Sequence, residues 1–216
     1  MVAPDSLTLA ATEQLARKVL AERVRNLYEI SPYGHVASLA GIAVAAYGLN
    51  GVIDGRFLVA WIILQLALVA SLGVLYLRYR RSSVPGRDLE QWERRYALGA
   101  GASGMGWGLF AFVLMPSYSI PHQMLVTFIV LAMMLIGMGT MQASRRAFEW
   151  FALPAIAGLE LELVSRGGSL YHVAAILVAA LSALLLYLFI RVNREMAEML
   201  TARFENDSLL QDFTRA

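Results

Sequence analysis

Apolar residues gather in six long stretches along this chain, separated by short polar or charged connections. The stretches are Tyr33–Ile53, Phe57–Leu77, Tyr96–Met115, His122–Met141, Phe148–Val164 and Leu170–Ile190. Hydrocarbon about 30 Å thick requires roughly 20 helical residues to cross, and most of the stretches have that length. Their apolar runs are continuous and lack the alternation of barrel strands, so they predict helices rather than a membrane β-barrel. We therefore expect an all-α polytopic membrane protein with six transmembrane helices.

The basic residues predict which way this protein faces. When the six stretches are threaded back and forth, all of the 18 Lys and Arg residues except Arg56 and Arg166 fall on one side. Short loops rich in Lys and Arg are retained in the cytoplasm during insertion. We therefore expect a multi-pass protein with both termini in the cytoplasm.

Composition agrees with this picture and narrows the chemistry. With 58% hydrophobic residues and a mean hydropathy of +0.58, the chain is too apolar for an ordinary soluble domain. The isoelectric point near 9.0 does not call for a nucleic-acid partner. Arginines that face anionic membrane lipids on the cytoplasmic side are enough to explain this value. The absence of cysteine excludes disulfides, thiolate metal sites and cysteine nucleophiles.

The chain divides into three parts, residues 1–32, 33–190 and 191–216. The first part is predicted to be a cytoplasmic amphipathic helix, because apolar residues from Leu15 to Leu27 form one stripe. Ser31-Pro32 is expected to end that helix before the six-helix membrane domain begins. Two interpretations stay open for it: it lies in the headgroup plane of the membrane, or it packs on the bundle as a solvated helix.

The last part of the chain carries a heptad pattern. No Gly or Pro occurs after Leu170, so the sixth helix is expected to continue into the cytoplasm. Alternating spacings of three and four residues connect Phe189, Val192, Met196, Met199, Arg203, Asn206, Leu210 and Phe213. This spacing favours a parallel dimeric coiled coil, with Arg203 and Asn206 as polar core positions that fix its register. The alternative is a single amphipathic tail lying on the bilayer.

Small residues crowd the third stretch. Ala100, Gly104 and Gly108 form a ridge spaced by four, which allows helix backbones to approach closely inside a membrane. Packing within one chain is the favoured use, while a dimer face and a ligand cavity stay open. Gly137 and Gly139 of the fourth stretch are the expected complementary groove.

Two carboxylates stand out in the fifth stretch. Glu160 and Glu162 lie among leucines, and ionisable groups in hydrocarbon are costly and often functional. Residues two apart on a helix point about 200° apart, so both cannot face one site. The favoured interpretation is that the helix emerges at Leu159 and both carboxylates are hydrated. The alternative is a ligand-binding cavity at the outer rim, formed by Glu160, Glu162, Asp54, His122, Tyr171 and His172.

The sequence offers little support for catalysis or for a metal site. His122 and His172 are expected at the outer side and His35 at the inner side, with no pair at the spacing of metal ligands. The ten methionines fit adaptable packing better than a copper path. Phosphate-binding glycine loops, nucleophile elbows and paired catalytic carboxylates are lacking. We expect no cofactor, no metal and no enzymatic activity in this chain.

Several short motifs connect the chain to a known class of proteins. They are Leu27-Tyr28, Gly104-Met105-Gly106-Trp107-Gly108 with Met115-Pro116, Ala152-Leu153-Pro154-Ala155, and Arg203-Phe204-Glu205-Asn206 with Leu209-Leu210. With these motifs the chain resembles the N-terminal six-helix membrane region of bacterial signalling proteins, chiefly hybrid sensor histidine kinases and GGDEF-type diguanylate cyclases. The stretch Leu159–Leu163 departs from this pattern, because its two glutamates replace plainer apolar residues.

The resemblance implies a sensory input module in the bacterial inner membrane. A small-molecule or lipophilic signal would favour one of two bundle packings, and the sixth helix would pass the change on within a homodimer. The output domain would follow Ala216, with a histidine kinase favoured over a cyclase. The alternative is a small self-contained transporter or channel, for which polar residues inside the stretches, such as Gln65 and Thr127, are scarce. A lipid-modifying enzyme is a third possibility, with only Glu149 and the neighbouring arginines as candidate acid–base groups.

Overall fold

Six helices form the structure, a computed structural model that describes the backbone of residues 4–82 and 88–215. Side chains are described for residues 13–82, 88–204 and 206. The helices are α1 (Pro4–Leu49), α2 (Gly55–Arg81), α3 (Leu89–Leu114), α4 (Ile120–Thr140), α5 (Arg145–Arg166) and α6 (Ser169–Arg215). The all-α prediction is confirmed for this part of the chain.

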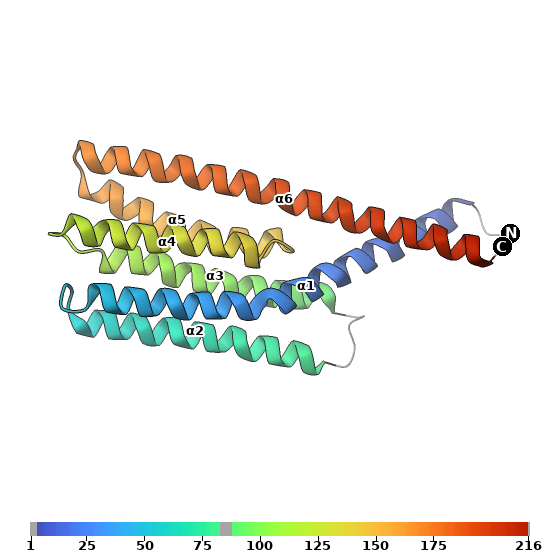
Figure 1. The fold of residues 1–216 in the computed structure, drawn as a ribbon, viewed down its shortest axis with the longest axis horizontal. Helices are drawn as coiled ribbons and strands as arrows, with labels where there is room; N and C mark the ends of the chain where they lie inside the picture. Colours follow the sequence, from blue (N-terminus) through green and yellow to red (C-terminus); the bar gives the residue numbers. More distant parts are fainter. Residues whose placement is uncertain (1–3, 83–87, 216) are drawn as a thin grey trace.

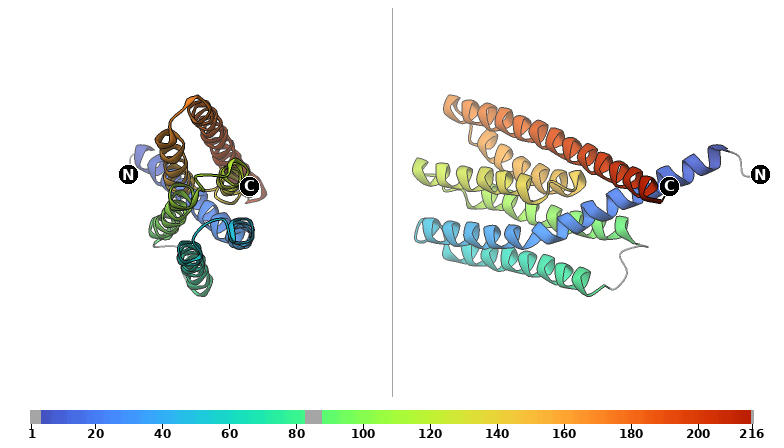
Figure 2. Two further views of the ribbon diagram at one scale, coloured as in Figure 1. Left: turned by 90° about the vertical axis from the view of Figure 1, so that its left-hand side faces the viewer. Right: turned by 45° about the vertical axis from the view of Figure 1, so that its right-hand side comes forward.

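The helices run up and down in one bundle, and α1 and α6 extend beyond it at the same end (Figure 1). We call this the projecting end, and the opposite end, where α1 turns into α2, α3 into α4 and α5 into α6, the loop end. The two helices contact each other, but the far ends of their extensions lie on opposite sides when the molecule is viewed along the bundle (Figure 2, left). The α5–α6 turn consists of Gly167 and Gly168, whose φ angles of 67° and 86° suit glycine.

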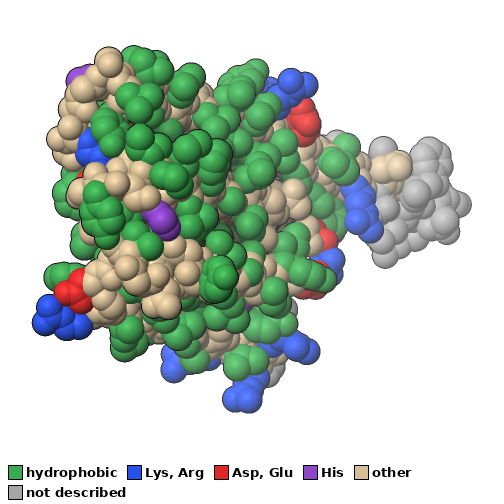
Figure 3. Space-filling model, turned by 60° about the vertical axis from the view of Figure 1, so that its left-hand side comes forward, with side chains coloured by type: hydrophobic (Ala, Val, Ile, Leu, Met, Phe, Trp, Pro, Cys, Tyr) green, Lys and Arg blue, Asp and Glu red, His purple; other side chains and the backbone are tan. Residues whose placement is uncertain are grey.

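Four of the helices are long and apolar enough to cross a membrane. They are α2, α3, α4 and the Ser169–Phe204 part of α6. Helix α5 falls short of this measure because it carries charged residues at both ends and at Glu160, and α1 falls short as well. Hydrophobic side chains cover most of the surface in Figure 3, and charged ones gather near the margins. This is the character of a membrane protein.

Helix α1 does not end before the bundle. It runs unbroken through Pro32, so the predicted break at Ser31-Pro32 is wrong. Val24, Leu27 and Tyr28 are at most 1% exposed, so the turns before the proline are packed into the core. This packing outweighs the backbone hydrogen bond that proline removes, and α1 bends where it leaves the bundle (Figure 1). This stretch of α1 therefore belongs to the bundle.

Helices α3 and α5 form the closest pair in the molecule. A side chain at Gly104 or Gly108 would collide with the backbone carbonyls of Phe151 or Pro154, and one at Gly158 would collide with Gly108. The small-residue ridge is thus used within one chain, and Ala100 is fully buried with it.

The prediction that Gly137 and Gly139 of α4 form the groove for this ridge was wrong. A side chain added at Gly139 of α4 would meet open space, and one added at Gly137 would collide with the Phe151 ring of α5 rather than with α3. Both α3 and α5 run from the projecting end to the loop end, so they lie parallel. Their backbones touch because glycine occupies the contact on both helices.

Candidate signal-coupling site

A polar cluster ties four helices together at the loop end. It consists of Glu162, Arg166, Gln123 and Tyr171, and we call it the loop-end cluster. Arg166 Nε donates to Glu162 Oε1 at 2.7 Å, and both side chains are 12% exposed. The same guanidinium donates to the carbonyls of Met115 (2.7 Å) and Pro116 (3.1 Å), just after α3 ends. Arg166 therefore satisfies a carboxylate and two carbonyls that follow a helix C-terminus.

Gln123 and Tyr171 extend the loop-end cluster to α4 and α6. Gln123 Nε2 donates to the Pro116 carbonyl at 2.8 Å, and the Tyr171 hydroxyl donates to Gln123 Oε1 at 2.9 Å. The Arg166 guanidinium lies 5.8 Å from the centre of the Tyr171 ring. The start of α6 is thereby fixed to the ends of α3, α4 and α5.

The other predicted rim residues do not join this cluster. His122 Nδ1 is hydrogen-bonded with Ser119 Oγ at 2.5 Å at the start of α4, and His172 is exposed. Asp54 is exposed at the start of α2, where it accepts from the Arg56 backbone and pairs with the Arg56 guanidinium at 2.9 Å. These hydrogen bonds hold the pKa of Asp54 below its usual value. The structure thus brings Glu162 and Tyr171 together, but not the whole rim.

Glu160 and Glu162 point in different directions, as their spacing predicts. Glu162 pairs with Arg166, whereas Glu160 Oε1 is buried with no hydrogen-bond partner among the described residues. The interpretation that both carboxylates are hydrated is wrong for Glu162, because Arg166 covers it. Glu160 is half-buried on α5.

The turn between α4 and α5, residues 142–144, is held by three other helices at the projecting end. We call it the junction turn. Arg23 Nε of α1 donates to Ala143 O (2.8 Å), Ser144 Oγ donates to Glu93 Oε1 of α3 (2.6 Å), and Asn193 Nδ2 of α6 donates to Gln142 O (2.6 Å). Ser144 also caps α5 by accepting from the Ala147 backbone. The junction turn therefore connects α4 to α5 and contacts α1, α3 and α6. It lies at the level where α6 leaves the bundle.

An aromatic cluster next to the junction turn joins α1, α2 and α3. The Tyr28 ring stacks on Tyr79 with centroids 4.0 Å apart, and its hydroxyl donates to the Trp92 carbonyl at 3.1 Å. Burial, followed by the nearby Tyr96 and Tyr79, raises the pKa of Tyr28. The hydroxyl thus stays protonated and keeps its hydrogen bond at any physiological pH.

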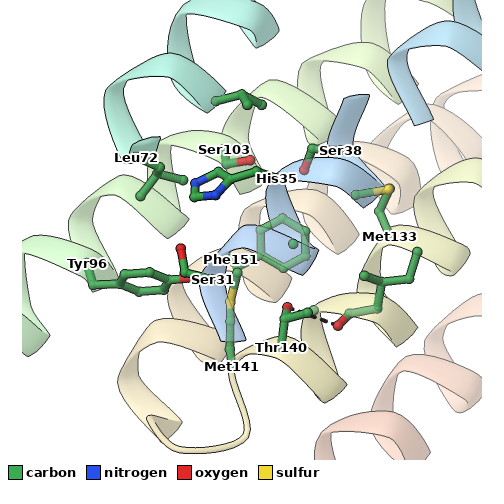
Figure 4. Close-up of a pocket in the computed structure, with 14 residues that line it drawn as sticks. Ser31, His35, Ser38, Leu72, Tyr96, Ser103, Met133, Thr140, Met141 and Phe151 are labelled. Atoms are coloured by element: carbon green, nitrogen blue, oxygen red, sulfur yellow. Dashed lines mark hydrogen bonds between the residues drawn. The ribbon is translucent and has the colours of Figure 1, made fainter. Parts of the chain in front are cut away.

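A small cavity with a mostly apolar lining lies in the bundle beside the junction turn. Its volume is about 30 Å³, and its lining comes from helices α1 to α5 and from Met141 (Figure 4). Ser31 Oγ is buried there without a hydrogen-bond partner among the described residues, and His35, Tyr96 and Ser103 also line the space. The cavity has room for about one water molecule. Among the described residues, no group of His, Asp and Glu could hold a metal ion.

The exposed part of the predicted coiled-coil seam on α6 begins at Val192 rather than at Phe189. Phe189 is fully buried and stacks on Phe148 of α5 with centroids 4.0 Å apart, so it belongs to the bundle. The next seam residues are exposed, except for the half-buried Met196; the exposed ones are Val192, Met199, Arg203 and Asn206. The side chains of Leu210 and Phe213 lie outside the described residues.

Sequence reasoning missed the contacts of the junction turn. Asn193 lies between two seam positions, and Glu93 and Arg23 lie in charged segments that look solvated. The only local signal was Ser144, which stands directly before a helix as a typical N-cap.

In comparisons with protein families, curated proteins and solved structures, no match was found for this chain. The functional argument therefore rests on the geometry of the bundle.

Proposed function

We propose that this chain is the membrane-embedded sensory input module of a bacterial signal-transduction protein. The observation that carries the proposal is the course of α6. This helix runs without a break from the loop-end cluster, past the junction turn, to well beyond the bundle. Such a helix converts a change inside the membrane into a movement outside it.

The proposal includes six transmembrane helices with the projecting end in the cytoplasm of a bacterial cell. Helix α5 supports this topology because it lies parallel to α3, at the same depth and in backbone contact with it. Its charges at the ends fit the two headgroup regions, and Glu162 is neutralised by Arg166. The arginines at the projecting end follow the positive-inside rule.

The mechanism follows from three contacts that hold α6 at different depths, in addition to the buried apolar face between them. Tyr171 ties it to the loop-end cluster, Phe189 to α5, and Asn193 to the junction turn. A signal that binds one packing of the bundle more tightly would shift α6 along or about its axis. A typical coupling of about 1–3 kcal/mol changes output by roughly 5–150-fold.

The exposed seam of α6 suits a second copy of the chain. Val192, Met199, Arg203 and Asn206 face away from the bundle, and their spacing is that of a parallel coiled coil. A homodimer formed there would carry the movement of α6 to an output domain beyond residue 216. As the sequence resemblance implies, a histidine kinase is the favoured output.

A transporter or channel would need a polar route through the membrane. The cavity inside the bundle holds about 30 Å³, and the buried Gln65 lies against Gly106 instead of lining a path. These observations favour the sensory function over transport.

Single cysteines test the dimer, because the natural chain has none. Met199→Cys is expected to cross-link into dimers in native membranes under mild oxidation. The matched control is Arg194→Cys, which is also exposed but lies about 140° away around α6. Equal cross-linking of both variants, or none of Met199→Cys, would contradict the seam.

Insertions that change the helical register of α6 test whether this helix transmits the signal. The module is joined in phase to a histidine kinase core, and one residue is inserted after Met199. This single insertion is expected to change the autophosphorylation rate clearly from that of the uninterrupted fusion. An insertion of seven residues, about two helical turns, is expected to return the rate to that value. Unchanged activity after the single insertion would sink the proposed mechanism.

A further inference from the structure

An open pocket lies at the projecting end between α3 and α5, outside the contacts described above. Its lining residues are Arg94, Ala97, Leu98, Arg146 and Trp150, and its volume is about 390 Å³. Both helices start at this end of the bundle, so the two arginines stand at similar depth on neighbouring elements.

The two arginines of the pocket are available to an anion. Arg94 and Arg146 are exposed, and neither forms an ion pair with a described residue. Two carboxylates near them on the same helices are engaged elsewhere, because Glu149 pairs with Arg145 at 2.5 Å and Glu93 accepts from Ser144. Glu90, one turn before Arg94, is exposed and forms no ion pair with it in the described structure. A single guanidinium can bind a phosphate through two parallel N–H···O hydrogen bonds, and two guanidinium groups can share one phosphate.

The rest of the pocket lining is apolar, and exposed apolar side chains follow it toward the loop end. The Trp150 ring packs beside Gly101 and stays 48% exposed, and Leu98 is 49% exposed. Further along the same faces, Met105 of α3 and Leu153 of α5 are each 55% exposed. Because the helices are parallel, both offer a basic residue first and apolar residues after it.

We propose that this pocket binds an anionic glycerophospholipid of the cytoplasmic leaflet. Its phosphate lies between Arg94 and Arg146, and an acyl chain follows the exposed apolar side chains. Basic pockets between transmembrane helices on the cytoplasmic side hold such headgroups, and tryptophan is favoured at headgroup depth. A soluble phosphate compound would leave the apolar wall of the pocket unused. This lipid site is separate from the signalling role proposed above and does not depend on dimerisation.

Native mass spectrometry of the full chain tests the site. The detergent-purified protein is titrated with phosphatidylglycerol and, separately, with phosphatidylcholine. We expect preferential binding of phosphatidylglycerol, and the double variant Arg94→Gln/Arg146→Gln should weaken it by roughly tenfold or more. The control Arg78→Gln/Arg81→Gln removes the same charge from α2 at the same end and should bind like the natural protein.

Other arms of the experiment separate the explanations. The single variants Arg94→Gln and Arg146→Gln should each show an intermediate loss, which keeps the test valid if the double variant folds poorly. Millimolar inorganic phosphate should leave the bound lipid in place. The proposal is overturned if the double variant binds phosphatidylglycerol normally, if the α2 control loses as much, or if free phosphate displaces the lipid.

Discussion

Helices α3 and α6 are held in the bundle in very different ways. Of the most apolar stretch of α3, 61% is buried inside the protein, against 28% for α6. Helix α3 meets α5 backbone to backbone at glycines, whereas α6 meets the bundle through side chains on one buried face, such as Val178, Leu185 and Phe189. One bundle thus combines a pair joined at the backbone with a helix that side chains hold along one face.

The difference has a physical basis. Backbones in contact have no rotamers to change, so α3 and α5 can separate only as a whole. Helix α6 is held by side chains, which can change rotamer, along its buried apolar face and at Tyr171, Phe189 and Asn193. An interface packed by side chains, rather than by backbones in contact, is the kind of element that can switch between two arrangements.

The largest predicted effect comes from wedging the fixed pair apart. Gly104→Val places a branched side chain against the Phe151 carbonyl, and neither backbone can withdraw. We expect a loss of more than ~4 kcal/mol, so that little folded protein survives size-exclusion chromatography in detergent. Gly139→Val adds the same residue where α4 has open space, and it should be recovered normally. Equal recovery of the two variants would show that the glycine seam is not what fixes α3 to α5.

Loosening α6 should cost less. Phe189→Ala removes the ring that stacks on Phe148 and should lower the free energy of unfolding by about 3 kcal/mol. Met199→Ala, on the exposed side of α6, should change it by less than about 0.5 kcal/mol in a monomeric preparation. Thermal unfolding followed by circular dichroism compares the two. A large effect of Met199→Ala would mean that this side of α6 packs inside the protomer.

The two glutamates of α5 should respond in opposite ways. Glu162→Gln removes the charged partner of Arg166 and should destabilise the protein by about 2 kcal/mol. Glu160→Gln neutralises a carboxylate that has a buried, unpartnered oxygen, so it should be neutral or stabilising. The same thermal measurement decides; a larger loss from Glu160→Gln would contradict the assignment of the ion pair to Glu162.

The smallest predicted effect concerns the aromatic cluster. Tyr28→Phe keeps the stacking on Tyr79 but removes the hydrogen bond to the Trp92 carbonyl. A loss of about 1 kcal/mol is expected. Tyr79→Phe retains the ring and has no described hydrogen bond from its hydroxyl, so it serves as the control. If both variants lose the same amount, the Tyr28 hydrogen bond does not stabilise the junction region.

Much of this architecture follows from local patterns in the sequence. Apolar length predicted the helices, the spacing of Ala100, Gly104 and Gly108 predicted close packing, and the lack of Gly and Pro predicted the long α6. Pro32 was misjudged because its local penalty is smaller than the packing gained by the turns around it. Predictions from local sequence patterns were therefore correct where no tertiary packing opposed them, and the prediction at Pro32 failed because tertiary packing did.

Which helices are neighbours could not be predicted from the pattern. Hydropathy marks a helix but not its partner, so Gly137 and Gly139 were assigned to a groove that α5 provides instead. The loop-end cluster and the junction turn depend on residues far apart in the chain, such as Arg23 with Ala143. Their polar side chains resemble ordinary loop residues until the fold places them together.

Spin-label distances would test most directly the claim that α6 moves against a fixed α3–α5 pair. Cysteines at Leu109 and Leu161 report on α3–α5, and cysteines at Leu109 and Leu177 report on α3–α6; all three residues are exposed. Labelled protein diluted with unlabelled protein in lipid nanodiscs gives the distances within one chain. A narrow distribution for α3–α5 and a clearly broader or two-peaked one for α3–α6 is the predicted result. Equally narrow distributions for the two pairs would contradict the account.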